Sequence, residues 1–388
     1  MPYDPELRGN GCPVFKKCGG CQLQNLTYPE QLRYKQGRCV ALLGRFGHVG
    51  RIIGMEEPYH YRCKVQAGFA KTRAGLVSGV YQSGSGRVVP VEGCMIEDEV
   101  CSGAVAHVRD TLRELRIRPW DGRTGDVRHV LVRRGLYSGE LMVVVVTQTR
   151  QLPSKNAFVE NLLRRMPGIT TVVHNVCADP LPLTLGRENE ALYGAGSIVD
   201  TLLGKTFRIS PNSFYQVNPA MTGTLYRTAL DFLDLKGSET LLDAYCGTGT
   251  IGIAASDSAG RVIGVELNSD AVRDAKLNAR MNGADNAEFY RGDATAFMEA
   301  MAERGEKLDA LVMDPPRAGS SARFIRSAVK AAPERIVYVS CEPETLARDL
   351  ALFTGSGYRV RRIQPVDMFP HTKHCEVVAS LTRDSASR

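Results

Sequence analysis

From about residue 240 onward, short apolar runs alternate with longer stretches that have the spacing of amphipathic helices. Residues 268–283 are one such stretch: Asn268 can cap its start and Gly283 can end it. Strands that alternate with helices predict βαβ units and a parallel sheet, so we predict an α/β domain over 211–388. The predicted strands are TLLDAYC (240–246), RVIGVEL (261–267), AEFYRGD (287–293), LDALVMD (308–314) and RIVYVSC (335–341).

The first half of the chain has a different pattern, in which short runs alternate between apolar and polar positions. This alternation predicts a mostly antiparallel β region with some helices over 1–210. The segment RISPNSFYQVNP (208–219) is the predicted junction between the two domains. The runs are YRCKVQAGFA (61–70), GLVSGVYQ (75–82), VRHVLVRRG (127–135), ELMVVVVTQ (140–148) and ITTVVHNV (169–176).

Composition and charge narrow the class of protein. With 43% hydrophobic and 23% charged residues, the chain is typical of a globular protein. No apolar run reaches the ~20 residues that span a bilayer, and the N-terminus has no export signal. Residues 1–210 carry 28 Lys and Arg against 19 Asp and Glu, whereas 211–388 carry 21 against 23, so the first half is expected to hold a polyanion. Eleven unevenly spaced cysteines fit a reducing cytoplasm.

Polar and nucleophilic residues stand at the ends of the predicted parallel strands. Ligands of such sheets bind beyond the carboxyl ends of the strands, so these residues are expected to share one site. They are Asp243, Glu266, Asp293, Asp314 and Cys341.

The glycine-rich segment after the first of these strands, CGTGTIG (246–252), predicts a ligand loop. Its glycines match the dinucleotide pattern G-x-G-x-x-G, and both dinucleotide and S-adenosylmethionine sites follow it with an acidic residue, here Glu266, for the ribose. The Asp-Pro-Pro-Arg step at 314–317 favours S-adenosylmethionine, because two prolines make a stiff wall that can hold a flat base beside the transferred methyl group.

A thiol at the end of the next strand indicates covalent chemistry on a pyrimidine. C5 of a pyrimidine is a poor nucleophile until a thiolate adds to C6, and a base must later remove the C5 proton so that the thiolate leaves. Cys341 can supply the thiolate. Glu376, just before a final apolar run, can supply the base.

The N-terminal segment GCPVFKKCGGCQLQ places Cys12, Cys18 and Cys21 around a glycine turn. Three thiolates need a fourth ligand, and the spacing accepts either zinc or an iron–sulfur cluster. The candidates for the fourth ligand are Cys39, Cys63, Cys94 and Cys101.

Five segments, VSCEPETLARDL, DPPRAG, SFYQVNP, LLDAYCGTGTIG and MFPHTKHCEVV, resemble the motifs of the RNA uracil-C5 methyltransferase family. The resemblance covers essentially the whole chain. It implies a Rossmann-like S-adenosylmethionine methyltransferase domain behind an N-terminal iron–sulfur and RNA-binding β domain, with Cys341 as the nucleophile and Glu376 as the base. Its implied cofactor contacts are Gln216, Tyr245, Thr250, Glu266, Asp293 and Asp314.

The resemblance also selects among the metal alternatives: it implies a [4Fe-4S] cluster on Cys12, Cys18, Cys21 and Cys94. Family members with this cysteine motif point to 23S ribosomal RNA rather than tRNA as the substrate. Since the sequence begins eleven residues before Cys12, an extra N-terminal barrel found in some members is not expected. Basic residues would then hold the RNA, for example Arg62, Lys64, Arg133 and Arg134.

We therefore expect a monomeric cytoplasmic enzyme that forms 5-methyluridine in RNA, not DNA. Three alternatives stay open: a tRNA substrate, a cytosine-C5 or amine-directed RNA methyltransferase, and a non-catalytic iron–sulfur RNA-binding or redox-sensing protein. The segment MDPPRAG argues against the cytosine-C5 enzyme, which usually places a cysteine within this motif.

Overall fold

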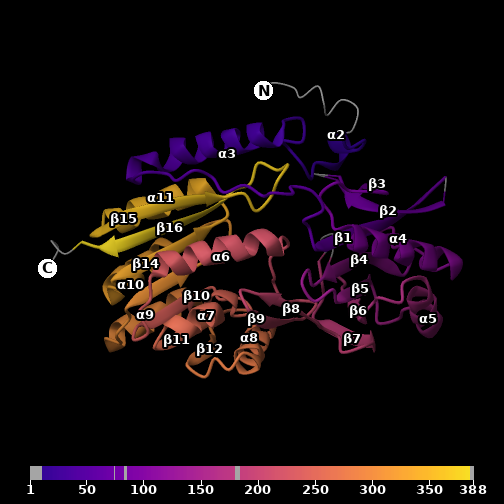
Figure 1. Ribbon diagram of the computed structural model, residues 1–388. Helices are drawn as coiled ribbons and strands as arrows, with labels where there is room; N and C mark the ends of the chain where they lie inside the picture. The colour runs from indigo at the N-terminus through magenta and orange to yellow at the C-terminus, as the bar shows by residue number, and fades with distance from the viewer. Residues whose placement is uncertain (1–10, 74, 83–84, 180–183, 385–388) are drawn as a thin grey trace.

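The computed structural model describes residues 11–73, 75–82, 85–179 and 184–384, which form two seven-stranded sheets lying side by side (Figure 1). A two-stranded hairpin of β8 (Ile198–Leu202) and β9 (Lys205–Ile209) lies between them. Within the described ranges, no helix combines the length and the apolar composition needed to cross a membrane.

The second sheet has the strand order β12-β11-β10-β13-β14-β16-β15. The first five of these strands run parallel, and β16 is antiparallel to both of its neighbours. The order reverses between β10 and β13, and open α/β sheets bind ligands at such a reversal. The five predicted parallel strands are confirmed as β10 (Thr240–Ala244), β11 (Arg261–Glu266), β12 (Ala287–Arg291), β13 (Ala310–Met313) and β14 (Arg335–Ser340). The final apolar run forms β16 (Glu376–Arg383), and β15 (Tyr358–Val366), which was not predicted, completes the sheet.

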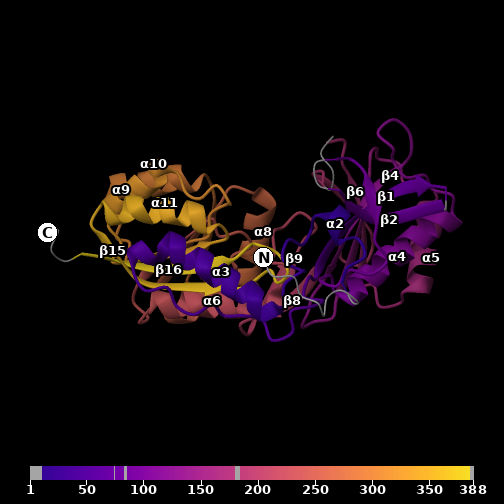
Figure 2. The same cartoon turned by 90° about the horizontal axis from the view of Figure 1, so that it is seen from above.

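Helices cover both faces of this sheet (Figure 2). Successive strand residues point to opposite faces. Leu241 and Val337 therefore join the core under α6, α7 and α8, whereas Leu242 and Ile336 join the core under α9, α10 and α11. The helices are α6 (Pro219–Leu233), α7 (Thr250–Ala255), α8 (Ser269–Met281), α9 (Ala294–Arg304), α10 (Ala322–Ala331) and α11 (Pro343–Thr354).

Helix α8 confirms the stretch predicted over 268–283. The Asn268 side chain accepts hydrogen bonds from the backbone nitrogens of Asp270 and Ala271, which would otherwise lack partners in the first turn. Beyond its end, Gly283 has a φ of +62°, a left-handed conformation that glycine adopts without strain.

The first sheet has the order β3-β2-β1-β4-β5-β6-β7, and all neighbours are antiparallel except β5 and β6. The mostly antiparallel prediction is thus confirmed. Helices α4 (Glu99–Glu114) and α5 (Lys155–Arg165) pack on one face. The strands are β1 (Lys64–Thr72), β2 (Gly75–Tyr81), β3 (Val88–Pro90), β4 (Val127–Arg134), β5 (Leu141–Thr147), β6 (Thr171–Val176) and β7 (Glu188–Tyr193).

A shared core joins the two sheets. On β5, Val143 and Val145 pack under α4 and α5, whereas Val144 and Val146 point the other way, into the core that also contains α6 and the β8–β9 hairpin. The predicted boundary at residue 210 follows β9. Before β1, however, helix α3 (Tyr28–Leu43) crosses to the second sheet and packs on α11 and β15 (Figures 1 and 2).

Candidate active site

The glycine-rich loop between β10 and α7 is held in one shape by its neighbours. Asp243, at the end of β10, accepts a hydrogen bond of 2.8 Å from the backbone nitrogen of Gly252. Gly249 has a φ of +82°, and a Cβ there would lie 2.9 Å from the ring of Phe289, so this position requires glycine. These two contacts therefore fix the loop against the core of the sheet.

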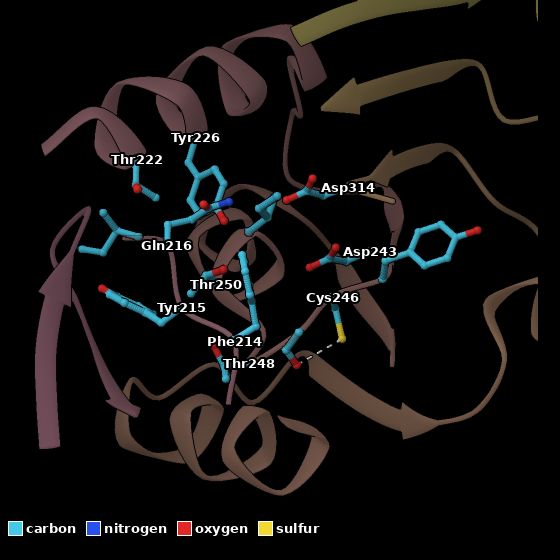
Figure 3. A pocket seen from close by; sticks show the side chains of 14 residues that line it. Phe214, Tyr215, Gln216, Thr222, Tyr226, Asp243, Cys246, Thr248, Thr250 and Asp314 are labelled. Atoms are coloured by element: carbon cyan, nitrogen blue, oxygen red, sulfur yellow. Dashed lines mark hydrogen bonds between the residues drawn. The ribbon is translucent and has the colours of Figure 1, made fainter. Parts of the chain in front are cut away.

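A cavity lies against this loop. In Figure 3 the carboxyl groups of Asp243 and Asp314 point toward the space beside Gln216 and Thr250. Four of the predicted cofactor residues line this cavity, namely Gln216, Tyr245, Thr250 and Asp314. They come from three separate parts of the chain: the segment before α6, the glycine-rich loop and the end of β13.

The other two predicted cofactor residues, Glu266 and Asp293, lie outside the lining of the cavity. Glu266 ends β11, and its carboxylate accepts hydrogen bonds from the backbone nitrogens of Gly247 at 3.2 Å and Asn268 at 2.8 Å. Asp293 is exposed and caps helix α9 through a 2.9 Å hydrogen bond from Ala296. The roles of all six residues as cofactor contacts stay predictions.

The carboxyl groups of the cavity have unusual proton affinities. Burial, together with the nearby charges of Asp314 and Glu266, raises the pKa of Asp243 to about 8 although Gly252 donates to it. Burial also raises the pKa of Asp314 to about 7. Within the described ranges, neither carboxyl forms an ion pair. The cavity therefore favours a ligand that brings positive charge or hydrogen-bond donors.

Cys341 and Glu376 stand opposite each other at the end of two paired strands. The antiparallel register of β14 and β16 runs to the pair Ser340 and Val377, so the next position of each strand brings Cys341 opposite Glu376. Opposite residues of such a pair have Cα atoms about 5 Å apart. Cys341 is half-buried and Glu376 is 3% exposed. The predicted nucleophile and base thus lie together. Cys341 follows β14, and Asp314 follows the neighbouring strand β13.

Both groups hold their protons tightly. Burial, followed by the charges of Glu376 and Asp314, raises the pKa of the Cys341 thiol to about 12, and the Arg317 guanidinium opposes this shift. Burial, with Asp314 and Glu342, also raises the pKa of Glu376 well above its usual range. A carboxylate in this position is a stronger base than an exposed one.

A larger cleft of about 600 Å³ lies between the two sheets. Gln216 lines both the cleft and the smaller cavity, so the two spaces adjoin. On the first-sheet side the cleft is lined by Arg62 and Lys64, and on the other side by Arg317. His374 also lines it but is neutral, because burial lowers its pKa to about 4. This positively charged wall suits a polyanion.

Comparisons with known proteins identify the family of the chain. The family model of the tRNA (uracil-5-)-methyltransferases matches residues 200–384. A protein of Halalkalibacterium halodurans, described as an uncharacterized RNA methyltransferase, is 42% identical over 377 residues, covering 95% of this chain and 82% of that protein. One of Clostridium tetani is 38% identical, covering 96% and 82%.

Among solved structures, the tRNA (uracil-54, C5)-methyltransferase of Pyrococcus abyssi, in complex with S-adenosyl-L-homocysteine, has a TM-score of 0.79 and 28% identity, covering 94% of this chain and 86% of that one. The chain belongs to the RNA uracil-C5 methyltransferase family. The resemblance seen in the sequence is confirmed.

In this methyltransferase the four N-terminal metal-ligand candidates meet at the larger cleft. Cys12, Cys18, Cys21 and Cys94 all line it, next to the short helix α2 (Phe15–Cys18). Burial, then the charges of the other three thiols, raises the pKa of Cys21 to about 12. Nevertheless, in the part of the chain that the structure describes, no three or more potential ligands are arranged to hold a metal ion. The predicted iron–sulfur cluster is therefore not confirmed.

Two of the residues expected to hold RNA have other roles in the methyltransferase. Arg133 is 2% exposed, and its guanidinium donates to the carbonyl oxygens of Ser210 and Ser213. The prediction that Arg133 contacts RNA is wrong, because β4 is buried on both faces. Arg134 forms a 2.8 Å ion pair with Asp98.

Sequence reasoning missed the part of the methyltransferase cavity that α6 forms. Thr222 and Tyr226 of this helix line the cavity beside Gln216 (Figure 3). A signal was present: the Asn218 side chain caps α6 and Pro219 occupies its first position, a combination typical of a helix start.

Proposed function

We propose that this protein uses S-adenosylmethionine to form 5-methyluridine in RNA, with 23S ribosomal RNA as its substrate. The observation that carries this proposal is the placement of Cys341 opposite Glu376, at the end of the strand that pairs with β13. Strand β13 leads to Asp314, which lines the cavity together with the glycine-rich loop, whereas Cys341 and Glu376 themselves are not part of that lining. Amine-directed methylation needs no covalent nucleophile, and a binding protein needs neither group.

The chemistry of the cavity fits S-adenosylmethionine. Gln216, Tyr245, Thr250 and Asp314 would hold it, with Glu266 and Asp293 at the neighbouring strand ends, and the P. abyssi relative was solved with the demethylated product of this cofactor. When bound, S-adenosylmethionine supplies a methyl group on a positively charged sulfur. The carboxyls of Asp243 and Asp314, which lack cationic partners within the described ranges, suit that charge.

Cys341 and Glu376 would divide the reaction between them. The Cys341 thiolate adds to C6 of the uracil ring, and the electron pair of the C5–C6 double bond moves onto C5 and the neighbouring carbonyl oxygen. C5 would then form a bond to the methyl carbon as the carbon–sulfur bond of the bound cofactor breaks and its electron pair stays on the sulfur, which becomes a neutral thioether. The Glu376 carboxylate removes the C5 proton, the electrons of that C–H bond re-form the double bond, and the sulfur leaves as a thiolate. Arg317 assists by lowering the pKa of Cys341.

The target uridine has to leave its base stack to reach Cys341, so an unpaired uridine of a structured RNA is the expected substrate. The cysteine motif supports ribosomal RNA, whereas the names of the matching family and of the P. abyssi enzyme support tRNA as the second candidate. Mapping 5-methyluridine in both RNAs, from cells with and without the gene, tests this. Loss of a site in 23S RNA supports the proposal, and loss in tRNA alone overturns the choice of substrate.

We also propose that Cys12, Cys18, Cys21 and Cys94 hold the predicted [4Fe-4S] cluster. Their thiols share one cleft, and the pKa of Cys94 is raised to about 11 by burial and by nearby negative charge, including that of Cys18. A metal centre that binds thiolates would relieve this repulsion while drawing the ligands together. Reconstitution with iron and sulfide, followed by metal analysis and absorption spectroscopy, should show four iron atoms per chain; bound zinc would contradict the proposal.

A further inference from the structure

The loop 367–375, which joins β15 to Glu376, is hydrogen-bonded to side chains on one face of helix α3. Lys35, fully buried on this helix, donates hydrogen bonds from Nζ to Asp367 Oδ1 at 2.6 Å and to the carbonyl oxygen of Phe369 at 2.9 Å. A buried ion pair with a second hydrogen bond fixes the orientation of both partners. The start of the loop is therefore tied to α3.

The middle of the loop depends on the same helix. Gln31 lies one turn before Lys35, and its side-chain oxygen accepts a hydrogen bond of 2.7 Å from the backbone nitrogen of His371. His371 has a φ of +67°, which is uncommon for a residue other than glycine. Such a conformation persists where the surroundings impose it, so the contact with α3 helps to determine the course of the chain toward Glu376.

Arg38 extends this face of α3 and reaches two segments at once. Its Nη1 donates to the carbonyl oxygen of Lys373 at 3.0 Å, three residues before Glu376. Its Nη2 contacts Glu342 Oε1 and Glu344 Oε2, each at 2.5 Å, and its Nε donates to Glu344 Oε1 at 2.9 Å. Glu342 directly follows Cys341. One guanidinium thus bridges the turn after the nucleophile and the loop before the base.

We propose that Arg38 is a positioning residue, which fixes the turn after Cys341 relative to the loop before Glu376. In this arrangement the thiol and the carboxylate can both reach the same uracil ring. This inference rests on the proposed function. The planar guanidinium donates in several fixed directions, whereas a lysine ammonium is a single flexible charge. Charge alone would therefore not replace the bridge.

The test measures steady-state methyl transfer by full-length Arg38→Ala, with labelled S-adenosylmethionine and the RNA that the wild-type protein methylates. Misplacement of catalytic groups lowers kcat, and we expect a loss of about tenfold or more. The KM for S-adenosylmethionine should stay within about twofold, because Arg38 does not line the cofactor cavity. We expect the kcat of Arg38→Lys to remain at least about threefold below that of the wild type, since lysine lacks the planar guanidinium that donates in several directions.

Rescue separates positioning from a folding defect. The Arg38 side chain is 20% exposed, so added guanidinium ion at low millimolar concentration can enter and should restore part of the kcat of Arg38→Ala. Arg33→Ala is the matched control, because Arg33 lies on the same helix with its side chain 72% exposed; it should keep wild-type kcat and show no rescue.

The outcomes also distinguish this inference from the proposed function. Wild-type kcat in Arg38→Ala, or in Arg38→Lys if the alanine variant does not fold, overturns the role of Arg38 provided that Cys341→Ala is inactive. A fully active Cys341→Ala overturns the proposed function itself.

Discussion

In the second sheet five parallel strands end at one edge, whereas in the first sheet nearly all neighbours run in opposite directions. Parallel ends gather Asp243, Asp314 and Cys341 at one place, and antiparallel strands spread their ends over two edges. The first sheet instead supplies Arg62 and Lys64 to the wall of the open cleft. On the proposed function, the bond-making groups come from one sheet, and the other sheet is expected to hold the substrate.

The largest effect on methyl transfer is expected from substitution of Cys341, the thiol at the end of β14. Cys341→Ala removes the nucleophile, so methyl transfer should fall by about a thousandfold or more in an assay with labelled cofactor. Cys177→Ala, at a buried cysteine of the shared core, is the control and should remain active. Equal losses in the two variants would break the assignment of chemistry to the second sheet.

The pH dependence of methyl transfer follows from the raised pKa of Cys341, which is about 12. The thiolate reacts and the thiol does not, so the single-turnover rate should rise by about tenfold per pH unit from about pH 7 to pH 9. Arg317→Gln raises the pKa further and should lower the rate by about tenfold at neutral pH. Arg323→Gln, which removes an exposed arginine paired with Glu299, should leave the rate unchanged. A rate of methyl transfer that does not change between pH 7 and pH 9 would contradict the proposal that the Cys341 thiolate is the reacting form.

Within the second sheet, Asp314 and Asp293 both follow strands, but their side chains have different surroundings. Asp314 lines the cavity, whereas Asp293 caps α9. Asp314→Asn should weaken binding of S-adenosylmethionine by about tenfold, because a hydrogen bond to a charged group is lost. Calorimetry on Asp293→Asn measures whether the predicted contact of that residue exists: a loss as large as for Asp314→Asn would show that it does.

The smallest effect is expected on the first sheet. Burial, then repulsion from Arg133 and Arg62, lowers the pKa of Lys64 to about 7. Only a part of the molecules therefore carries a protonated Lys64 at neutral pH, and a bound phosphate would favour the protonated form. Lys64→Met should weaken RNA binding by about threefold and reduce its salt dependence by about one charge, with kcat unchanged. Lys71→Met, at an exposed position of β1, is the control. A fall in kcat for Lys64→Met would place chemistry in the first sheet as well.

The five parallel strands of the second sheet could be predicted closely because each is a local apolar run with a polar residue at its end, and α8 carries both of its end signals. Strand β15 was missed, because its sequence YRVRRIQPV is rich in arginine and is not an apolar run. The pairing of Cys341 with Glu376 could not, since it depends on the long-range register of β14 and β16. Likewise, Arg133 alternates like an exposed residue, yet the shared core covers its face of β4 and the core under α4 and α5 covers the other face. Nothing local in α3 indicates that it crosses to the other sheet.

The central claim is that sulfur of Cys341 bonds to the uracil ring and that Glu376 releases it. Intact mass spectrometry of Glu376→Gln after incubation with S-adenosylmethionine and substrate RNA, under denaturing conditions, tests this most directly. A covalent protein–RNA species that carries the transferred methyl group is the predicted result. Free methylated RNA, released at the wild-type rate with unmodified protein, would contradict it.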